Sequence, residues 1–411
     1  MFPRHSITIS LSAYLFITCF SGKAIALETP PFDASEHQEI AAIDQDFTPD
    51  DRVISDLSDS LIDPEFDKNL PSLRMAWQER SGQLWQTDVD GVTGAWTPSN
   101  GRQSLVDTDL MVVGKTRQGP EWAYDNRGNR LIYTKKMESG QPRLYQAWRN
   151  PTTQQLVKTP LVAGDNKALY ETSHDLGDPT PRIIYSYRKA DANRTTMAYG
   201  WREIDEPTTD ALLPLNFQFP QWVSGRRAIV ATARIDGVRQ VVYYDIDTGK
   251  TTIITSDLAQ KRFPLIWQDP ATQSYVLSAV MDDTTIGIWR QKSQDDWVLT
   301  SHLNPPTELP YIFKPDWFVW HGASYLAYLM HTEKSGQTQN HQGKGEVWVS
   351  CMSESHCQFL HRQVNHSTIT RIKDVENLAV DHTVYVYYAE ILPDQRRLIH
   401  RADSGLSLSN P

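Results

Sequence analysis

The stretch FPQWVSGRRAIV, residues 219–230, joins a Pro-x-Trp motif to a glycine turn and an apolar strand. The same motif stands at residues 120–122 and 315–317, and with one extra residue at 264–267. Repetition at a spacing of roughly fifty residues is typical of a radial repeat fold, in which every unit is a small sheet. We therefore predict an all-β, seven-bladed β-propeller, with six blades as the alternative count.

Strands and turns of the expected kind continue along the chain. Ser224-Gly225 and Asp236-Gly237 lie between apolar stretches, where a tight hairpin needs glycine. The third strand of each unit is marked by an aromatic or apolar residue at a matching place: Trp85, Tyr145, Tyr199, Tyr243, Trp289, Trp348 and Ile399. The blades are expected to begin near residues 72, 118, 167, 216, 261, 312 and 370.

Two parts of the fourth unit carry a family resemblance. Phe219–Val230, followed by Val241–Gly249, resembles the TolB-type propeller repeat, and Pro120–Tyr133 of the second unit is similar. The chain departs from the usual Pro-Asp-Gly turn of that repeat, since it has Val-Ser-Gly or Asn-Arg-Gly there. The repeat occurs in periplasmic scaffolds, protease accessory domains and lyases, so the resemblance implies a blade and supplies no catalytic residue.

Residues 1–26 have the pattern of a signal peptide. Leu11–Phe20 is an apolar stretch too short to span a bilayer, and Ala24-Ile25-Ala26 supplies a small-x-small cleavage pattern. An uncleaved anchor is the alternative interpretation. Later apolar runs are too short for a membrane helix, so no integral membrane segment is expected after cleavage. We expect a periplasmic or secreted bacterial protein.

Residues 27–71 are expected to form an acidic N-terminal extension, and residues 72–411 the propeller. A capping threonine, a proline and two acids at Thr48–Asp51 predict the start of a short amphipathic helix that ends at Asp63-Pro64. The first blade has no obvious inner strand after residue 72. Either residues 53–60 supply that strand, or the C-terminal segment Gly405–Leu408 closes the ring.

One position of each inner strand predicts a site in the central channel. Alignment of the repeats places a residue directly before the Trp position: Glu121, Glu171, Gln221, Ile266, Asp316 and Glu376. Equivalent carboxylates around one axis would focus negative potential there. They indicate a site for a cationic ligand, or for a divalent cation held by Glu121, Glu171 and Asp316. His174 follows on the third blade as a ligand or base. The alternative is that each acid pairs with a basic residue of the next blade.

Two cysteines remain after the leader, Cys351 and Cys357, and they flank a short hairpin tip. In an oxidising compartment this spacing favours a disulfide. The alternative is a zinc site that adds nearby imidazoles, those of His356, His361 and His366.

The chain carries 40 basic and 50 acidic residues, a formal net charge of −10, and no basic stripe, so nucleic acid is not an expected partner. Hydrolase elbows, zinc-protease motifs and phosphate loops are also missing from the sequence. The prediction is therefore an exported scaffold in the cell envelope that binds a protein or a small-molecule or glycan ligand, without an obligatory cofactor. One alternative is a metal-dependent lyase or hydrolase working in the channel. Another is a carbohydrate-binding propeller that uses the tryptophans outside the repeat: Trp96, Trp148, Trp201, Trp297 and Trp320.

Overall fold

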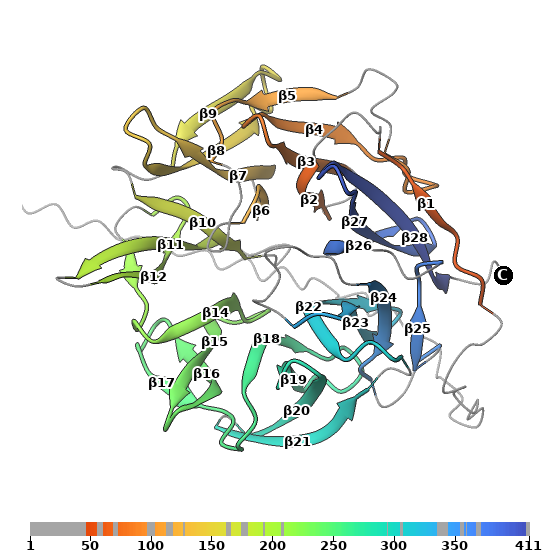
Figure 1. Cartoon of the computed structure of the whole chain (residues 1–411). Coiled ribbons are helices and arrows are strands. Elements are labelled where there is room, and N and C mark those ends of the chain that lie inside the picture. The colour runs from red at the N-terminus through yellow and green to blue at the C-terminus, as the bar shows by residue number, and fades with distance from the viewer. Residues whose placement is uncertain are drawn as a thin grey trace, which may run out of the picture. The chain divides into compact units, whose positions relative to one another are not determined.

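The computed structural model describes residues 47–55, 61–68, 73–96, 103–111, 118–125, 128–161, 166–173, 180–191, 194–206, 209–293, 295–304, 307–334, 344–353, 357–358, 360–366 and 371–407. These residues form seven four-stranded antiparallel sheets and contain no α-helix. The sheets are arranged around a common centre, as Figure 1 shows. The prediction of an all-β propeller is confirmed, with seven blades and not six.

The blades follow the chain in order. Blades one and two are β2 (Leu61–Asp67), β3 (Arg74–Glu79), β4 (Leu84–Asp88), β5 (Ser104–Asp107), β6 (Glu121–Asp125), β7 (Gly128–Lys136), β8 (Pro142–Arg149) and β9 (Leu156–Pro160). Blades three and four are β10 (Lys167–Thr172), β11 (Arg182–Asp191), β12 (Arg194–Glu203), β13 (Ala211–Leu212), β14 (Phe217–Trp222), β15 (Ala228–Ile235), β16 (Val238–Asp245) and β17 (Thr251–Ile253). Blades five and six are β18 (Lys261–Gln268), β19 (Tyr275–Met281), β20 (Thr285–Ser293), β21 (Asp296–Leu303), β22 (Tyr311–Trp320), β23 (Ala323–His331), β24 (Gly345–Cys351) and β25 (His361–Gln363).

Blade seven is built from both ends of the described chain. It contains β26 (Ile372–Val380), β27 (Thr383–Ile391), β28 (Arg397–Ser407) and, as its outermost strand, β1 (Asp51–Val53). Asp51 pairs with Ala402, and Val53 pairs with His400. The N-terminal strand therefore covers the sheet edge that β28 would otherwise expose.

Local sequence explains the hairpins. In β15 the residues AIVATAR contribute β-branched and small side chains, most of them buried. The turn to β16 is Asp236-Gly237, and both residues have positive φ, 48° and 87°. This is the backbone of a two-residue hairpin turn, which glycine adopts without steric cost.

The core lies between the blades. Seven clusters of buried apolar residues are found, and each joins two neighbouring sheets. The repeated Trp122, Trp222 and Trp267 belong to three of these clusters, and Trp317 packs against the cluster that holds Trp267. The motif tryptophans therefore pack one blade against the next. Because each pair of blades has its own core, the long chain needs no single large core.

The predicted N-terminal helix is wrong where it can be compared. Asp51–Val53 and Leu61–Asp67 are strands of blades seven and one. Residues 56–60 and the expected leader at 1–26 lie outside the described residues. Leu61–Asp67 is a strand that buries most of its side chains, and Asp51–Val53 is a strand because it pairs with β28, so tertiary contacts override the local capping pattern.

Candidate functional site: the central channel

A β-bulge recurs at one point of the inner strands. Six of the seven strands shift register there, between Ile62/Glu65, Leu169/Glu171, Gln218/Gln221, Arg262/Leu265, Phe313/Asp316 and Lys373/Glu376. In five of these bulges one non-glycine residue has positive φ: Asp63 (53°), Phe219 (52°), Phe263 (49°), Lys314 (38°) and Asp374 (53°). A bulge re-aims side chains, and here the positive-φ residue and the residue two positions later both line one cavity.

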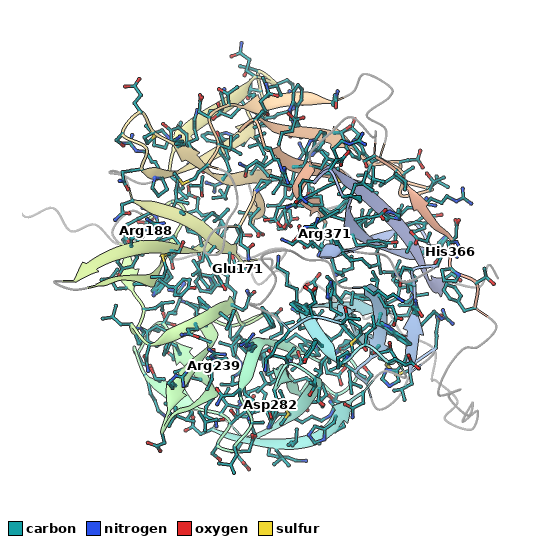
Figure 2. The ribbon with its side chains drawn as sticks, viewed as in Figure 1. Glu171, Arg188, Arg239, Asp282, His366 and Arg371 are labelled. Atoms are coloured by element: carbon teal, nitrogen blue, oxygen red, sulfur yellow. A yellow bond between two sulfur atoms is a disulfide. The ribbon has the colours of Figure 1, made fainter. Side chains whose placement is uncertain are left out.

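The cavity occupies about 540 Å³ among the inner strands. Its main row of side chains comes from the position just after each bulge and from Glu121 of β6: Glu65, Glu121, Glu171, Gln221, Leu265, Asp316 and Glu376. The five carboxylates come from five consecutive blades around the ring, six, seven, one, two and three. Figure 2 shows Glu171 pointing toward the centre, while Arg188 and His366 lie far from it.

A second row comes from the positive-φ residues. Lys314 Nζ lies 3.3 Å from one oxygen of Asp374, and Arg397 Nη1 lies 3.2 Å from the other. The Asp63 carboxylate accepts a hydrogen bond from the backbone N–H of Gly119. A Cβ at Gly119 would stand 2.6 Å from Cβ of Asp63, so glycine is required for this close approach.

Lys68, at the end of β2, extends into the main row. Its Nζ lies 3.7 Å from Asp316 Oδ2 and 3.7 Å from Glu376 Oε2. Asn377 also donates a side-chain hydrogen bond to Asp316. The channel therefore already holds an ammonium group between carboxylates of two neighbouring blades.

Burial and mutual repulsion perturb the acids. Burial, together with the charges of Glu121 and Glu376, raises the pKa of Glu65 well above its ordinary range. Burial and the charge of Glu171 do the same to the pKa of Glu121. Burial and Asp316 raise the pKa of Glu376 to about 8, although Lys68 opposes the shift.

The pKa values of the two lysines are also raised, which favours their charged forms. Burial disfavours the charge of Lys68, but Asp316 and Glu376 outweigh it, so the pKa of Lys68 is raised. For Lys314 the carboxylates of Asp374 and Asp63 likewise overcome burial and raise its pKa. Both lysines therefore stay charged at neutral pH, while several carboxyl groups share protons.

Blades four and five give the cavity a different wall. Their inner strands place Gln221 and Leu265 in the main row and two aromatic rings, Phe219 and Phe263, in the second. The centroids of these rings are 4.9 Å apart. The cavity is thus acidic on one side and apolar on the other.

The structure brings most of the predicted site together. Glu121, Glu171, Gln221, Asp316 and Glu376 all line the cavity. That these residues bind a ligand stays a prediction, and His174 lies outside the described residues.

Ile266 was assigned to the wrong position. It is buried in the core between blades four and five, and Leu265 takes the channel position. The bulge has the same place relative to the proline in blades four and five, so the residue after the proline faces the channel and the extra residue of the motif, Ile266, lies between it and Trp267.

Sequence reasoning missed five charged residues of the cavity: Asp63, Glu65, Lys68, Lys314 and Asp374. A signal was present for the first blade, since Pro64-Glu65-Phe66 is a Pro-x-aromatic motif like Pro120-Glu121-Trp122. No sequence pattern marked Asp63, Lys314 and Asp374 as channel residues, because the direction of their side chains depends on the bulge.

The cysteine prediction is confirmed by a disulfide between Cys351 and Cys357, with Cα atoms 6.0 Å apart. The thiols are therefore not available to a zinc ion. His361 Nδ1 forms a 2.8 Å hydrogen bond with Ser350 Oγ, and His356 lies outside the described residues. Among the residues that can be described, no group of three or more His, Cys, Asp or Glu side chains has an arrangement that could hold a metal ion.

The tryptophans outside the repeat do not form an exposed platform. Trp96, Trp201 and Trp320 are buried, and Trp148 and Trp297 are half-buried on their strands. Packing in the protein interior therefore explains the three buried tryptophans, and no sugar ligand is needed to explain them.

Comparison with known proteins gives the fold and not the family. No family model matches the sequence, and no curated protein matches it either. The chain is similar in structure to an oligogalacturonate lyase from Vibrio parahaemolyticus, with 10% identity, a TM-score of 0.52, and coverage of 86% of this chain and 93% of the lyase. It is also similar to a puromycin-hydrolyzing peptidase of Mycobacterium tuberculosis, with 11% identity, a TM-score of 0.52, and coverage of 86% and 53%. A putative TolB from Agrobacterium tumefaciens matches with 10% identity, a TM-score of 0.40, and coverage of 86% and 93%. In the part of the chain that the structure describes, no helix is long and apolar enough to cross a membrane.

Proposed function

We propose that this propeller is an exported binding protein whose channel takes a small organic cation, an ammonium or guanidinium group that carries an apolar or aromatic part. One observation carries the proposal. Carboxylates of five adjacent blades converge on a single cavity in which the chain's own ammonium groups, Lys68 and Lys314, lie among them.

The charge balance of the cavity favours a further cation. Among the described residues, seven carboxyl groups line it against two lysines, and Arg397 adds a third cation on Asp374, so acidic side chains outnumber these basic ones by seven to three. Repulsion keeps some of these groups protonated at neutral pH, as the raised pKa values of Glu65 and Glu121 indicate. A bound cation would favour their ionised forms, so binding would release protons.

The apolar wall limits the ligand class. Phe219, Phe263 and Leu265 would remove the apolar part of a ligand from water, and an aromatic face also attracts a neighbouring cation. A bare inorganic cation would leave this wall unused. The combination therefore supports an amphipathic amine over a simple ion.

The cell compartment is part of the proposal. The leader pattern of residues 1–26 and the Cys351–Cys357 disulfide both support an oxidising compartment outside the cytoplasm. Such a protein would act as an envelope scaffold that presents a ligand-loaded propeller to a partner.

Isothermal titration with 2-phenylethylamine tests the proposal. Its neutral analogue 2-phenylethanol has the same ring and serves as the matched ligand. We expect saturable binding of the amine only, a net release of protons measured in two buffers of different ionisation enthalpy, and tighter binding as the pH rises toward 8. The variant Glu121→Gln should weaken binding about tenfold, which corresponds to about 1.4 kcal/mol.

The control variant is Glu138→Gln, at an exposed position of the turn after β7. It should bind like the unchanged protein. Equal binding of the alcohol and the amine, or an unchanged affinity in Glu121→Gln, would contradict the proposal.

A metal-dependent lyase or hydrolase is the second candidate. An oligogalacturonate lyase in complex with manganese has a similar fold, with 8% identity and a TM-score of 0.50, which motivates a test with manganese. In this chain Glu121, Glu171 and Asp316 would be the oxygen ligands. Saturable manganese binding that is lost in Glu171→Gln, with no binding of the amine, would favour this candidate.

A further inference from the structure

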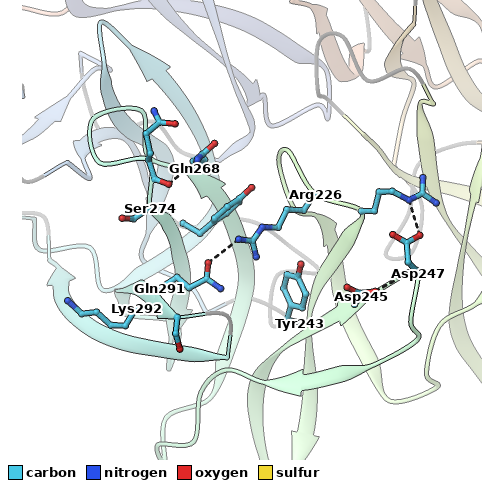
Figure 3. A pocket seen from close by; sticks show the side chains of 12 residues that line it. Arg226, Tyr243, Asp245, Asp247, Gln268, Ser274, Gln291 and Lys292 are labelled. Carbon is cyan, nitrogen blue, oxygen red and sulfur yellow. Dashed lines mark hydrogen bonds and ion pairs between the residues drawn. The ribbon is translucent and has the colours of Figure 1, made fainter.

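A groove on another part of the propeller lies between blades four and five. It has a volume of about 810 Å³, and Figure 3 shows its lining side chains. The walls come from the β14–β15 turn, from β16 and its following turn, and from β18, β19 and β20. None of the channel residues takes part in it.

Arg226 is held in a fixed orientation at the middle of this groove. Its guanidinium carbon lies 3.6 Å from the centroid of the Tyr275 ring, a stacked contact. Its Nη2 donates a 3.2 Å hydrogen bond to Gln291 Oε1, which Figure 3 marks with a dashed line. The hydroxyl of Tyr243 is a second polar neighbour of the guanidinium, whose charge opposes the rise that burial causes in the pKa of that tyrosine. A guanidinium has five N–H donors, so these two partners leave donors for a ligand.

The carboxylates near Arg226 interact with other groups. Arg227 binds Asp247 at 2.9 Å and Glu203 at 2.7 Å. The Asp245 carboxylate accepts hydrogen bonds from the backbone N–H and the hydroxyl of Thr248 within its turn. Among the residues that the structure covers, Arg226 itself has no carboxylate partner.

The other lining residues fit a hydrated ligand. They are two tyrosines and a set of amides, hydroxyls and one lysine, with no aliphatic side chain: Tyr243, Tyr275, Gln268, Gln273, Gln291, Ser274, Ser293 and Lys292. Planar amides and hydroxyls hydrogen-bond to hydroxyl groups, and a planar, stacked guanidinium matches the two oxygens of a carboxylate. A hydrophobic peptide would find no apolar pocket here.

From this geometry we infer a second binding site, in which Arg226 receives the carboxylate of an acidic saccharide and the surrounding amides receive its hydroxyl groups. The site is independent of the channel and of its proposed cation. It also places saccharide recognition on arginine and glutamine side chains, and not on the tryptophans outside the repeat.

Titration with a glucuronic acid tetrasaccharide tests the inference, and its carboxyl-reduced tetrasaccharide is the matched ligand. The acidic tetrasaccharide should bind saturably, and the affinity should fall at least tenfold in Arg226→Gln and severalfold in Arg226→Lys, which keeps the charge but loses the planar fork. Affinity should also fall as salt is raised.

Arg80→Gln is the control, because Arg80 is exposed in the turn between β3 and β4 and lies outside the groove. It should bind like the unchanged protein, and thermal melts should show every variant folded. Equal affinity for the acidic and reduced tetrasaccharides, an unchanged affinity in Arg226→Gln, or no saturable binding at millimolar ligand would overturn the inference.

Discussion

Glu376→Gln should stabilise this protein, and only above mildly acidic pH. The side chain of Glu376 is only 20% exposed, and burial together with Asp316 raises its pKa from 4.5 to about 8. Between these two values the unfolded chain holds Glu376 ionised while the folded chain holds it protonated. The residue therefore destabilises the fold increasingly as the pH rises from about 4.5, until the effect levels off near pH 8.

The size of the effect follows from the two pKa values. The interval between 4.5 and about 8 corresponds to at most about 5 kcal/mol at a pH above both. The raised pKa already includes the attraction of Lys68, and water screens the partly exposed side chain, so we expect a net gain of about 2 kcal/mol at pH 8.5. In a domain of this size that gain raises Tm by about 2 to 3 °C.

Thermal melts and urea unfolding at pH 4.5, 6, 7 and 8.5 measure the difference between Glu376→Gln and the unchanged protein. Glu138→Gln, at an exposed position, should show no such pH dependence. The reasoning is refuted if Glu376→Gln gives the same change at every pH, or if it destabilises at pH 8.5, because then the ion pair with Lys68 would outweigh the burial of the acid.

Three further changes probe other parts of the structure. Asp51→Asn should cost about 2 kcal/mol, because the Asp51 carboxylate accepts hydrogen bonds from Tyr388 and His400 where β1 closes the ring. The hydrogen bond to Asp51 and the charge of Asp51 raise the pKa of His400, although burial opposes the shift. The stability that the Asp51–His400 pair adds should therefore be full below pH 6.5 and should fade as the pH rises through the raised pKa. Melts from pH 5 to 9 measure the cost of Asp51→Asn, and a cost that stays constant over this range would argue against the pair. Replacing Cys351 and Cys357 together by serine should cost about 2 kcal/mol, measured as a lower midpoint of urea unfolding. The midpoint of the double variant should equal that of the unchanged protein in the presence of reductant. Equal midpoints of the two proteins without reductant would show that the disulfide adds no stability. Phe263→Ala should weaken 2-phenylethylamine more than ethylamine in the same titration, and an equal loss for both would remove the apolar wall from the proposal.

The repeat alone determined the fold class. Pro-x-Trp motifs and glycine turns specify a blade locally, since proline, tryptophan and Asp-Gly each favour one backbone or packing state. The motif also located Glu121, Glu171, Gln221, Asp316 and Glu376, because equivalent positions in a closed ring face one axis. These inferences needed no knowledge of contacts between distant residues.

Closure of the ring and the direction of the second row were decided only by tertiary structure. Asp51–Val53 becomes a strand because β28 offers it an unpaired edge more than three hundred residues later in the chain, and no local pattern records that edge. Asp63, Lys314 and Asp374 enter the channel because a bulge turns their backbone to positive φ, which the one-dimensional alternation of a strand does not reveal. The raised pKa values of the acids arise for the same reason, since repulsion and burial exist only after the seven blades have brought these side chains together.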